Sequence, residues 1–117
     1  IIPIIAILGA YHIAARYLKV PRLDVKKILV EMLQTRSPAL YPYISIDVAI
    51  DSLDLASTYN VESWDGYLIS LAKTLGAKII FTLDKELGKI AGVRIEIPFP
   101  QQIVEEYHRY IKSLIKR

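Results

Sequence analysis

The sequence predicts a single α/β domain, a three-layer sandwich built on a mainly parallel sheet. Strand-like apolar segments alternate along the chain with helix-like amphipathic segments, a pattern typical of parallel sheets with helical connections. Residues 77–82 are rich in apolar side chains, as expected of a strand that helices cover on both faces. With 117 residues, 53% of them hydrophobic, the chain is long enough to bury one core.

The first half of the chain predicts two strands and two helices. Residues 1–7 are apolar and β-branched like a buried strand, and Pro3 indicates that this strand begins irregularly or at an edge. A helix is expected over residues 9–18, before Pro21, and a second over residues 23–33. A turn and a short strand are expected next, over residues 35–38 and 41–44.

The second half predicts a helix over Ile46–Tyr59, capped by Ser45, and a helix over residues 64–75, capped by Ser63 and ended by Gly76. The apolar face of the first of these helices is Ile46, Ala49, Ile50, Leu53 and Ala56. The remaining elements are a strand over residues 77–82, a helical turn over 83–90, a strand over 93–97 and a helix over 101–116. We expect residues 1–100 to form the domain and residues 101–117 a C-terminal amphipathic helix.

The C-terminal helix and the hydropathy predict a partner subunit. One stripe of this helix is apolar and consists of Ile103, Val104, Tyr107, Ile111, Leu114 and Ile115. Because the mean hydropathy is high at +0.32, we expect some apolar surface to be covered in a homodimer. The basic residues are Arg109, Lys112, Lys116 and Arg117, which either form a solvated face or meet phosphate.

Composition excludes several functions. The chain has no cysteine, which rules out a disulfide framework, a thiolate zinc site and a cysteine nucleophile, and fits a cytoplasmic protein. The net charge of +3 permits an anionic partner such as RNA without requiring one. The apolar run of residues 1–10 is too short to span a bilayer and lacks the pattern of a signal peptide, so no membrane partner is expected.

Two aspartates occupy positions at which α/β proteins build sites. Asp65 opens a helix and Asp84 follows the end of a strand, with Thr82 two residues before it. Carboxylates that converge in this way bind a hard divalent cation such as Mg²⁺. Taken singly, Asp65 is also explained as a favourable charge at a helix N-terminus, and Asp84 as an N-cap of the following turn.

Other polar residues have simpler structural interpretations. His12 and His108 have no carboxylate at ligand spacing and are interpreted as ordinary surface or core residues. Asp47, Asp51 and Asp54 share one helix face, which is either a solvated face or an acidic metal cluster.

Residues 61–98 resemble the C-terminal half of a PIN domain. The resemblance rests on a helix-opening Asp65-Gly66, on Leu75-Gly76 before a strand, on Thr82-Leu83-Asp84 after it, and on a closing Gly-Val strand with proline over residues 92–98. PIN domains are mostly metal-dependent ribonucleases, and many are toxins of the VapBC type.

The resemblance implies a metal-dependent endoribonuclease with three or four acids that bind Mg²⁺ or Mn²⁺. By position, Asp65 and Asp84 are the catalytic metal ligands, Thr82 is a supporting hydroxyl, and Glu86 is a weaker candidate. RNA is the implied substrate, and an antitoxin protein is an implied partner.

The same comparison finds two acids of the family pattern missing. No strand ending in Asp-x-Asn occurs, and Gly9 stands near the position of a second acid, a glutamate. Either the first strand lies upstream of Ile1 or residues 1–7 are that strand with its acids lost; the spacing from Gly9 to Asp65 favours the former. The alternative hypothesis is a catalytically degenerate PIN-like domain that binds RNA or a protein.

Overall fold

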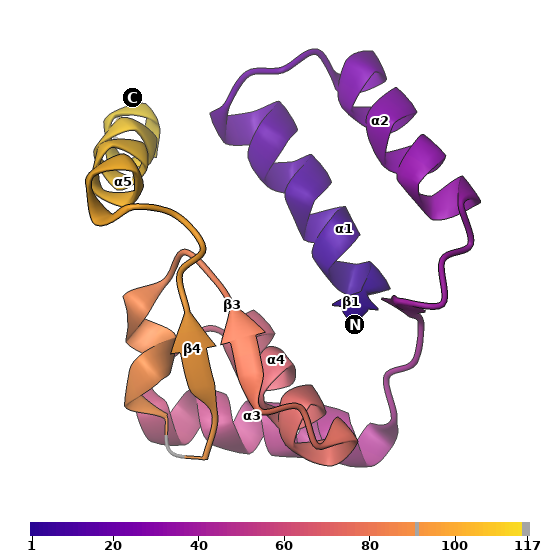
Figure 1. The fold of residues 1–117 in the computed structure, drawn as a ribbon, viewed down its shortest axis with the longest axis vertical. Helices are drawn as coiled ribbons and strands as arrows, with labels where there is room; N and C mark the ends of the chain where they lie inside the picture. The colour runs from indigo at the N-terminus through magenta and orange to yellow at the C-terminus, as the bar shows by residue number, and fades with distance from the viewer. Residues whose placement is uncertain (91, 116–117) are drawn as a thin grey trace. The chain divides into compact units, whose positions relative to one another are not determined.

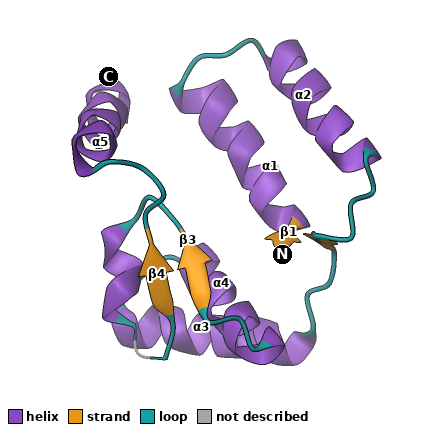
Figure 2. Ribbon diagram, in the orientation of Figure 1, coloured by secondary structure: helices purple, strands orange, loops and turns teal. Residues whose placement is uncertain are grey.

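Two pairs of parallel strands, with the helices that accompany them, make up the computed structural model, which describes residues 1–90 and 92–115 (Figures 1 and 2). The elements in chain order are β1 (Ile2–Pro3), α1 (Ile4–His12), the π-helix η1 (Ile13–Tyr17), α2 (Arg22–Gln34), β2 (Leu40–Tyr41), α3 (Ile46–Tyr59), α4 (Ser63–Leu75), β3 (Ile79–Phe81), the 3₁₀-helix η2 (Lys85–Lys89), β4 (Arg94–Glu96) and α5 (Gln101–Ile115). The predicted α/β class with parallel strand pairing is confirmed.

The chain divides into two units. The first contains Ile1–Tyr43 together with residues from Glu105 onwards, and the second is Ile44–Val104. Each unit holds one strand pair, β1–β2 in the first and β3–β4 in the second. The expected division into residues 1–100 and 101–117 stays a prediction. Within the described residues, no helix combines the length and hydropathy that crossing a membrane requires.

In the first unit, helices α1 and α2 form a hairpin whose ends are joined by the short β1–β2 pair (Figure 1). The predicted strand over residues 1–7 is reduced to Ile2–Pro3, and the helix begins at Ile4. An apolar β-branched run does not by itself distinguish a strand from a buried helix. Pro3 favours the start of a helix here, because its φ is fixed, at −62°, and it has no N–H that would need a partner in the first turn.

In the second unit, α3 and α4 pack closely at Gly66. A Cβ atom at this position would overlap the carbonyl oxygen of Ser52 on α3, so only glycine permits this approach. The predicted helix caps at Ser45 and Gly76 are confirmed: Ser45 Oγ accepts a hydrogen bond of 3.1 Å from the Val48 amide, and Gly76 adopts φ +71°.

The core of the second unit is small and one-sided. Ile69, Leu87 and Ile90 are fully buried, and Ile80 of β3 packs against them. Ile79 and Phe81, on the other face of β3, are 36% and 67% exposed. Within the described residues of the second unit, the packing on β3 therefore involves the face that carries Ile80.

Helix α3 has the predicted bounds but buries a different face. Ile46, Ile50 and Leu53 were expected to face the core and are 79%, 55% and 62% exposed. Val48 and Ser52 are buried instead. The helix is apolar on two sides, and the position of α4 against Ser52 selects the side that is buried.

Helix α5 is confirmed to Ile115, and its apolar stripe is only partly covered. Val104 is 2% exposed, whereas Ile103 is 54% exposed. The predicted basic residues Lys116 and Arg117 lie outside the described residues.

Candidate functional site

Strand β3 presents Thr82 and Asp84 directly after its carboxyl end. The Thr82 amide donates to the carbonyl of Glu96 at 3.1 Å, which continues the pairing with β4 by one residue. Thr82 Oγ1 accepts a hydrogen bond of 3.1 Å from the Asp84 amide. The threonine hydroxyl thus shapes the turn that carries Asp84, at the sheet edge where α/β proteins place their sites.

Asp65 is the third residue of α4. The predicted cap at Ser63 is wrong: Ser63 is already helical, and Glu62 holds the N-cap position without a side-chain cap bond. The Asp65 amide donates to the Glu62 carbonyl at 3.0 Å, and the Glu62 backbone hydrogen-bonds to the Asp65 carboxylate. The bond to the Asp65 carboxylate is half of a capping box and gives Asp65 a structural role at the helix start.

The negative charge of Asp84 affects the pKa of Asp65. Partial burial raises the pKa of Asp65 above its ordinary value of 3.8, the negative charge of Asp84 raises it further, and the hydrogen bond from the Glu62 backbone opposes both effects. A charge acts on a half-buried carboxyl in this way only from nearby. The charge of Asp84 therefore acts on Asp65, although a helix and a strand separate the two acids in sequence.

The packing of α4 explains why Asp65 has a defined position. The next residue is Gly66, which brings α4 against α3. One turn later Ile69, with no exposed surface, anchors the helix in the core. The acid is thus held at the start of a helix whose next turn is locked by packing, whereas Asp84 follows a strand that is hydrogen-bonded to β4.

The donor atoms of this region suit a hard divalent cation. Asp65 and Asp84 supply carboxylate oxygens and Thr82 a hydroxyl, and Mg²⁺ is usually held by one or two carboxylates while it keeps several waters. A cation would also relieve the repulsion that raises the pKa of Asp65. The described residues contain no group of three or more His, Asp or Glu side chains arranged for a metal ion. Glu86 belongs to η2, and its side chain lies outside what the structure describes.

The remaining candidates are separate from this pair. Asp47, Asp51 and Asp54 are exposed along α3 and form no metal group in the described part of the chain. His12 makes an edge contact with Tyr17, the ring centroids 5.7 Å apart, and His108 makes a tilted contact with Tyr107. The histidines therefore take part in ring contacts, in keeping with the simpler interpretation.

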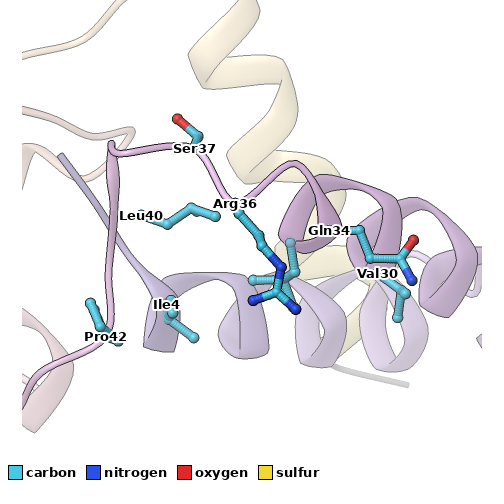
Figure 3. A pocket seen from close by; sticks show the side chains of 8 residues that line it. Ile4, Val30, Gln34, Arg36, Ser37, Leu40 and Pro42 are labelled. Carbon is cyan, nitrogen blue, oxygen red and sulfur yellow. The ribbon is translucent and has the colours of Figure 1, made fainter.

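A pocket of about 520 Å³ lies within the first unit (Figure 3). It is lined mainly by apolar side chains, and the full lining is Ile4, Val30, Leu33, Gln34, Arg36, Ser37, Leu40 and Pro42. Because this lining contains no carboxylate and none of the predicted site residues, the pocket is distinct from the Asp65–Asp84 region.

Comparison with known families identifies the chain. The family model of the PIN domain matches residues 1–93. Searches of curated proteins and of solved structures gave no match. Since the family match spans most of the chain and includes both Asp65 and Asp84, the protein belongs to the PIN domain family, whose general function is that of a nuclease.

Proposed function

We propose that this PIN domain is a metal-dependent endoribonuclease that hydrolyses RNA phosphodiesters with Mg²⁺ or Mn²⁺. The observation that supports it best is the pairing of Asp65 with Asp84. Two acids that come from separate elements lie close enough for one to raise the pKa of the other. A carboxyl group whose pKa is raised by burial and by a second acid is typical of catalytic sites.

The proposed chemistry assigns a role to each residue. Asp65 and Asp84 would hold the cation through their carboxylate oxygens, while Thr82 positions Asp84 through its backbone amide. A divalent cation bound there supplies positive charge that favours ionisation of water and stabilises the negative charge growing on the phosphate. Hydrolysis forms a P–O bond from water, breaks one P–O ester bond, and transfers a proton to the departing oxygen.

The biological setting is part of the proposal. Membership of the PIN family makes a toxin with an antitoxin partner a natural assignment, and we propose it together with a cytoplasmic location. A homodimer is proposed from the C-terminal helix, whose Ile103 and Tyr110 remain 54% and 51% exposed. The formal charge of +3 is compatible with RNA.

A second candidate is a degenerate PIN domain that binds RNA or a protein without cleaving it. Two observations favour it. The described residues contain no three-residue metal group, and Gly9 stands near the position of a family acid. Under this alternative, Asp65 would act only at the start of α4.

A cleavage assay separates the two candidates. A fluorescently labelled single-stranded RNA is incubated with the 117-residue protein in Mn²⁺, in Mg²⁺ and in EDTA, and RNA binding is followed in parallel by anisotropy. If the protein is the proposed endoribonuclease, we expect it to cleave the RNA in Mn²⁺ or Mg²⁺ and EDTA to abolish the cleavage. Binding without cleavage in either metal contradicts the enzyme and supports the degenerate domain.

A further inference from the structure

The first unit carries an excess of positive charge. Residues 1–43 contain six Lys or Arg and two Asp or Glu, whereas residues 44–104 contain five Lys or Arg and eight Asp or Glu. Three of the cations, Arg16, Lys19 and Arg22, lie at the connection between α1, with its π-helical extension η1, and α2 (Figure 1). These three residues form the cationic cluster. A concentration of basic residues in one part of a chain is the electrostatic feature by which proteins attract polyanions.

Aromatic rings hold two of these cations without neutralising them. The guanidinium carbon of Arg16 lies over the ring of Tyr17, 5.9 Å from its centroid, and that of Arg22 lies over the ring of Tyr11 at 5.8 Å. Arg22 Nη1 also donates a hydrogen bond of 3.2 Å to the Tyr11 hydroxyl. A ring restricts where an arginine side chain lies but, unlike a carboxylate, it brings no opposite charge. The two arginines are therefore positioned while their charge stays available.

The cationic cluster has no acidic partner among the residues that the structure describes. None of its three side chains forms an ion pair with a described residue, not even with Asp24, the acid nearest in sequence. The rest of the first unit leaves all three side chains exposed. Because burying an unpaired charge costs several kcal/mol, cations in this state either remain in water or meet an anion from another molecule.

The backbone at this connection departs from regular helix geometry. Residues Ile13–Tyr17 form a π-helix, a conformation that is rare and frequently found at functional sites. Lys19 adopts a left-handed conformation with φ +59°, which glycine would reach at lower cost. An unusual backbone thus coincides with the cationic cluster, and strained backbone of this kind gathers at functional sites.

A guanidinium that lies on an aromatic ring suits a single strand of nucleic acid in two ways. Its N–H groups donate to phosphate oxygens, and its flat surface, like an aromatic ring, stacks on an unpaired base. His12 adds a further ring, which makes an edge contact with Tyr17 at 5.7 Å between centroids. We propose that the cationic cluster, together with Tyr11 and Tyr17, is a binding site for single-stranded RNA.

This binding site includes neither Asp65 nor Asp84. The choice of RNA as the ligand rests on the proposed function, whereas binding itself requires neither metal nor cleavage. The two proposals therefore fail separately. Binding in EDTA without cleavage in Mn²⁺ or Mg²⁺ would contradict the enzyme alone, and cleavage by a protein whose RNA binding ignores the cationic cluster would contradict the binding site alone.

The test measures how a fluorescently labelled oligouridine of about 12 nucleotides binds the 117-residue protein, by anisotropy in EDTA over a series of salt concentrations. Arg16→Gln with Arg22→Gln is expected to weaken binding by about tenfold or more at 0.1 M salt. It should also reduce the slope of log affinity against log salt by about 1.4, since each phosphate contact with a single strand contributes about 0.7. The matched control Lys78→Gln with Lys112→Gln removes the same charge at exposed residues elsewhere and should leave the slope unchanged.

A second pair of variants tests the rings. Tyr17→Leu removes the ring under Arg16 and should weaken binding severalfold, whereas Tyr17→Phe keeps the ring and should bind like the parent. Inorganic polyphosphate, which has no bases to stack, should displace the RNA less well than unlabelled oligouridine at equal phosphate concentration. Circular dichroism checks that each variant folds.

Several results would overturn the RNA-binding site. They are no binding by the parent protein, an unchanged affinity and slope in the double arginine variant, equal weakening in the lysine control, and displacement by polyphosphate as efficient as by oligouridine. The last would show that any polyanion fills the site. Lys19→Gln, which lies outside the helices, keeps the test decisive if the arginine variants do not fold, because it should still lower the slope by about 0.7.

Discussion

The five aspartates of the second unit fall into two groups with different surroundings. Asp47, Asp51 and Asp54 follow one another along an exposed face of α3. Asp65 and Asp84 come from the start of α4 and the end of β3, and burial together with mutual repulsion raises the pKa of Asp65. The larger group is the closer in sequence, yet only the smaller pair lies partly enclosed by protein. Convergence of separate elements, more than the number of acids, distinguishes a candidate metal site from a solvated face.

The largest expected effect concerns catalysis. Asp65→Asn or Asp84→Asn should lower Mn²⁺-dependent RNA cleavage by at least about 100-fold, the scale seen when one preorganised group is removed from an active site. Asp51→Asn, on the exposed face of α3, should leave the rate unchanged. The comparison is measured by initial rates on a labelled RNA, and it fails if all three variants lose activity equally or if none does.

The next effect concerns the packing that positions Asp65. Gly66→Ala forces a methyl group into the carbonyl of Ser52 and should destabilise the fold by about 1–3 kcal/mol. Gly9→Ala is the matched control, because a Cβ there meets nothing within 4 Å and alanine favours a helix by about 0.5–1 kcal/mol. Urea unfolding measures both, and a Gly66→Ala protein as stable as the parent would contradict the close approach of α3 and α4.

Metal binding should distinguish the Asp65–Asp84 pair from the exposed aspartates of α3 without any assay of activity. A cation that binds only the folded protein stabilises it by about 2.7 kcal/mol at a concentration of 100 Kd. We expect Mg²⁺ or Mn²⁺ to raise the melting temperature of the parent and of Asp47→Asn, but not of a protein carrying both Asp65→Asn and Asp84→Asn. An equal shift in all three proteins would place the cation elsewhere.

The smallest effect is a pH dependence of stability. Because burial and Asp84 raise the pKa of Asp65 above 3.8, the folded state holds this proton more tightly than the unfolded chain does. That contribution is present below pH 3.8 and is lost as the pH rises through the raised value. It should be below about 1 kcal/mol, since water screens a half-exposed carboxyl.

Urea unfolding in metal-free buffer, repeated across this pH window, checks the sign of the effect. Asp65→Asn should show a smaller fall in unfolding free energy with rising pH than the parent, whereas Asp54→Asn should follow the parent curve. An identical pH dependence of the parent and Asp65→Asn would mean that Asp65 is not perturbed.

Local signals predicted much of the fold. The bounds of α3, its cap at Ser45 and the left-handed Gly76 agree with the structure, because helix periodicity and capping depend on neighbours in sequence. The prediction of a strand over residues 1–7 was wrong, because a short apolar run has no period that separates a strand from a helix. Asp65 was placed correctly at a helix start, but Ser63 was not its cap.

The sequence by itself determined the α/β class, the limits of α3, and the residue types available at a metal site. Only the tertiary structure decided which face of α3 packs against α4, and that the charge of Asp84 acts on Asp65. The physical reason is range: capping and periodicity are set within one or two turns of chain, whereas burial and the meeting of charges depend on segments that packing brings together from distant positions.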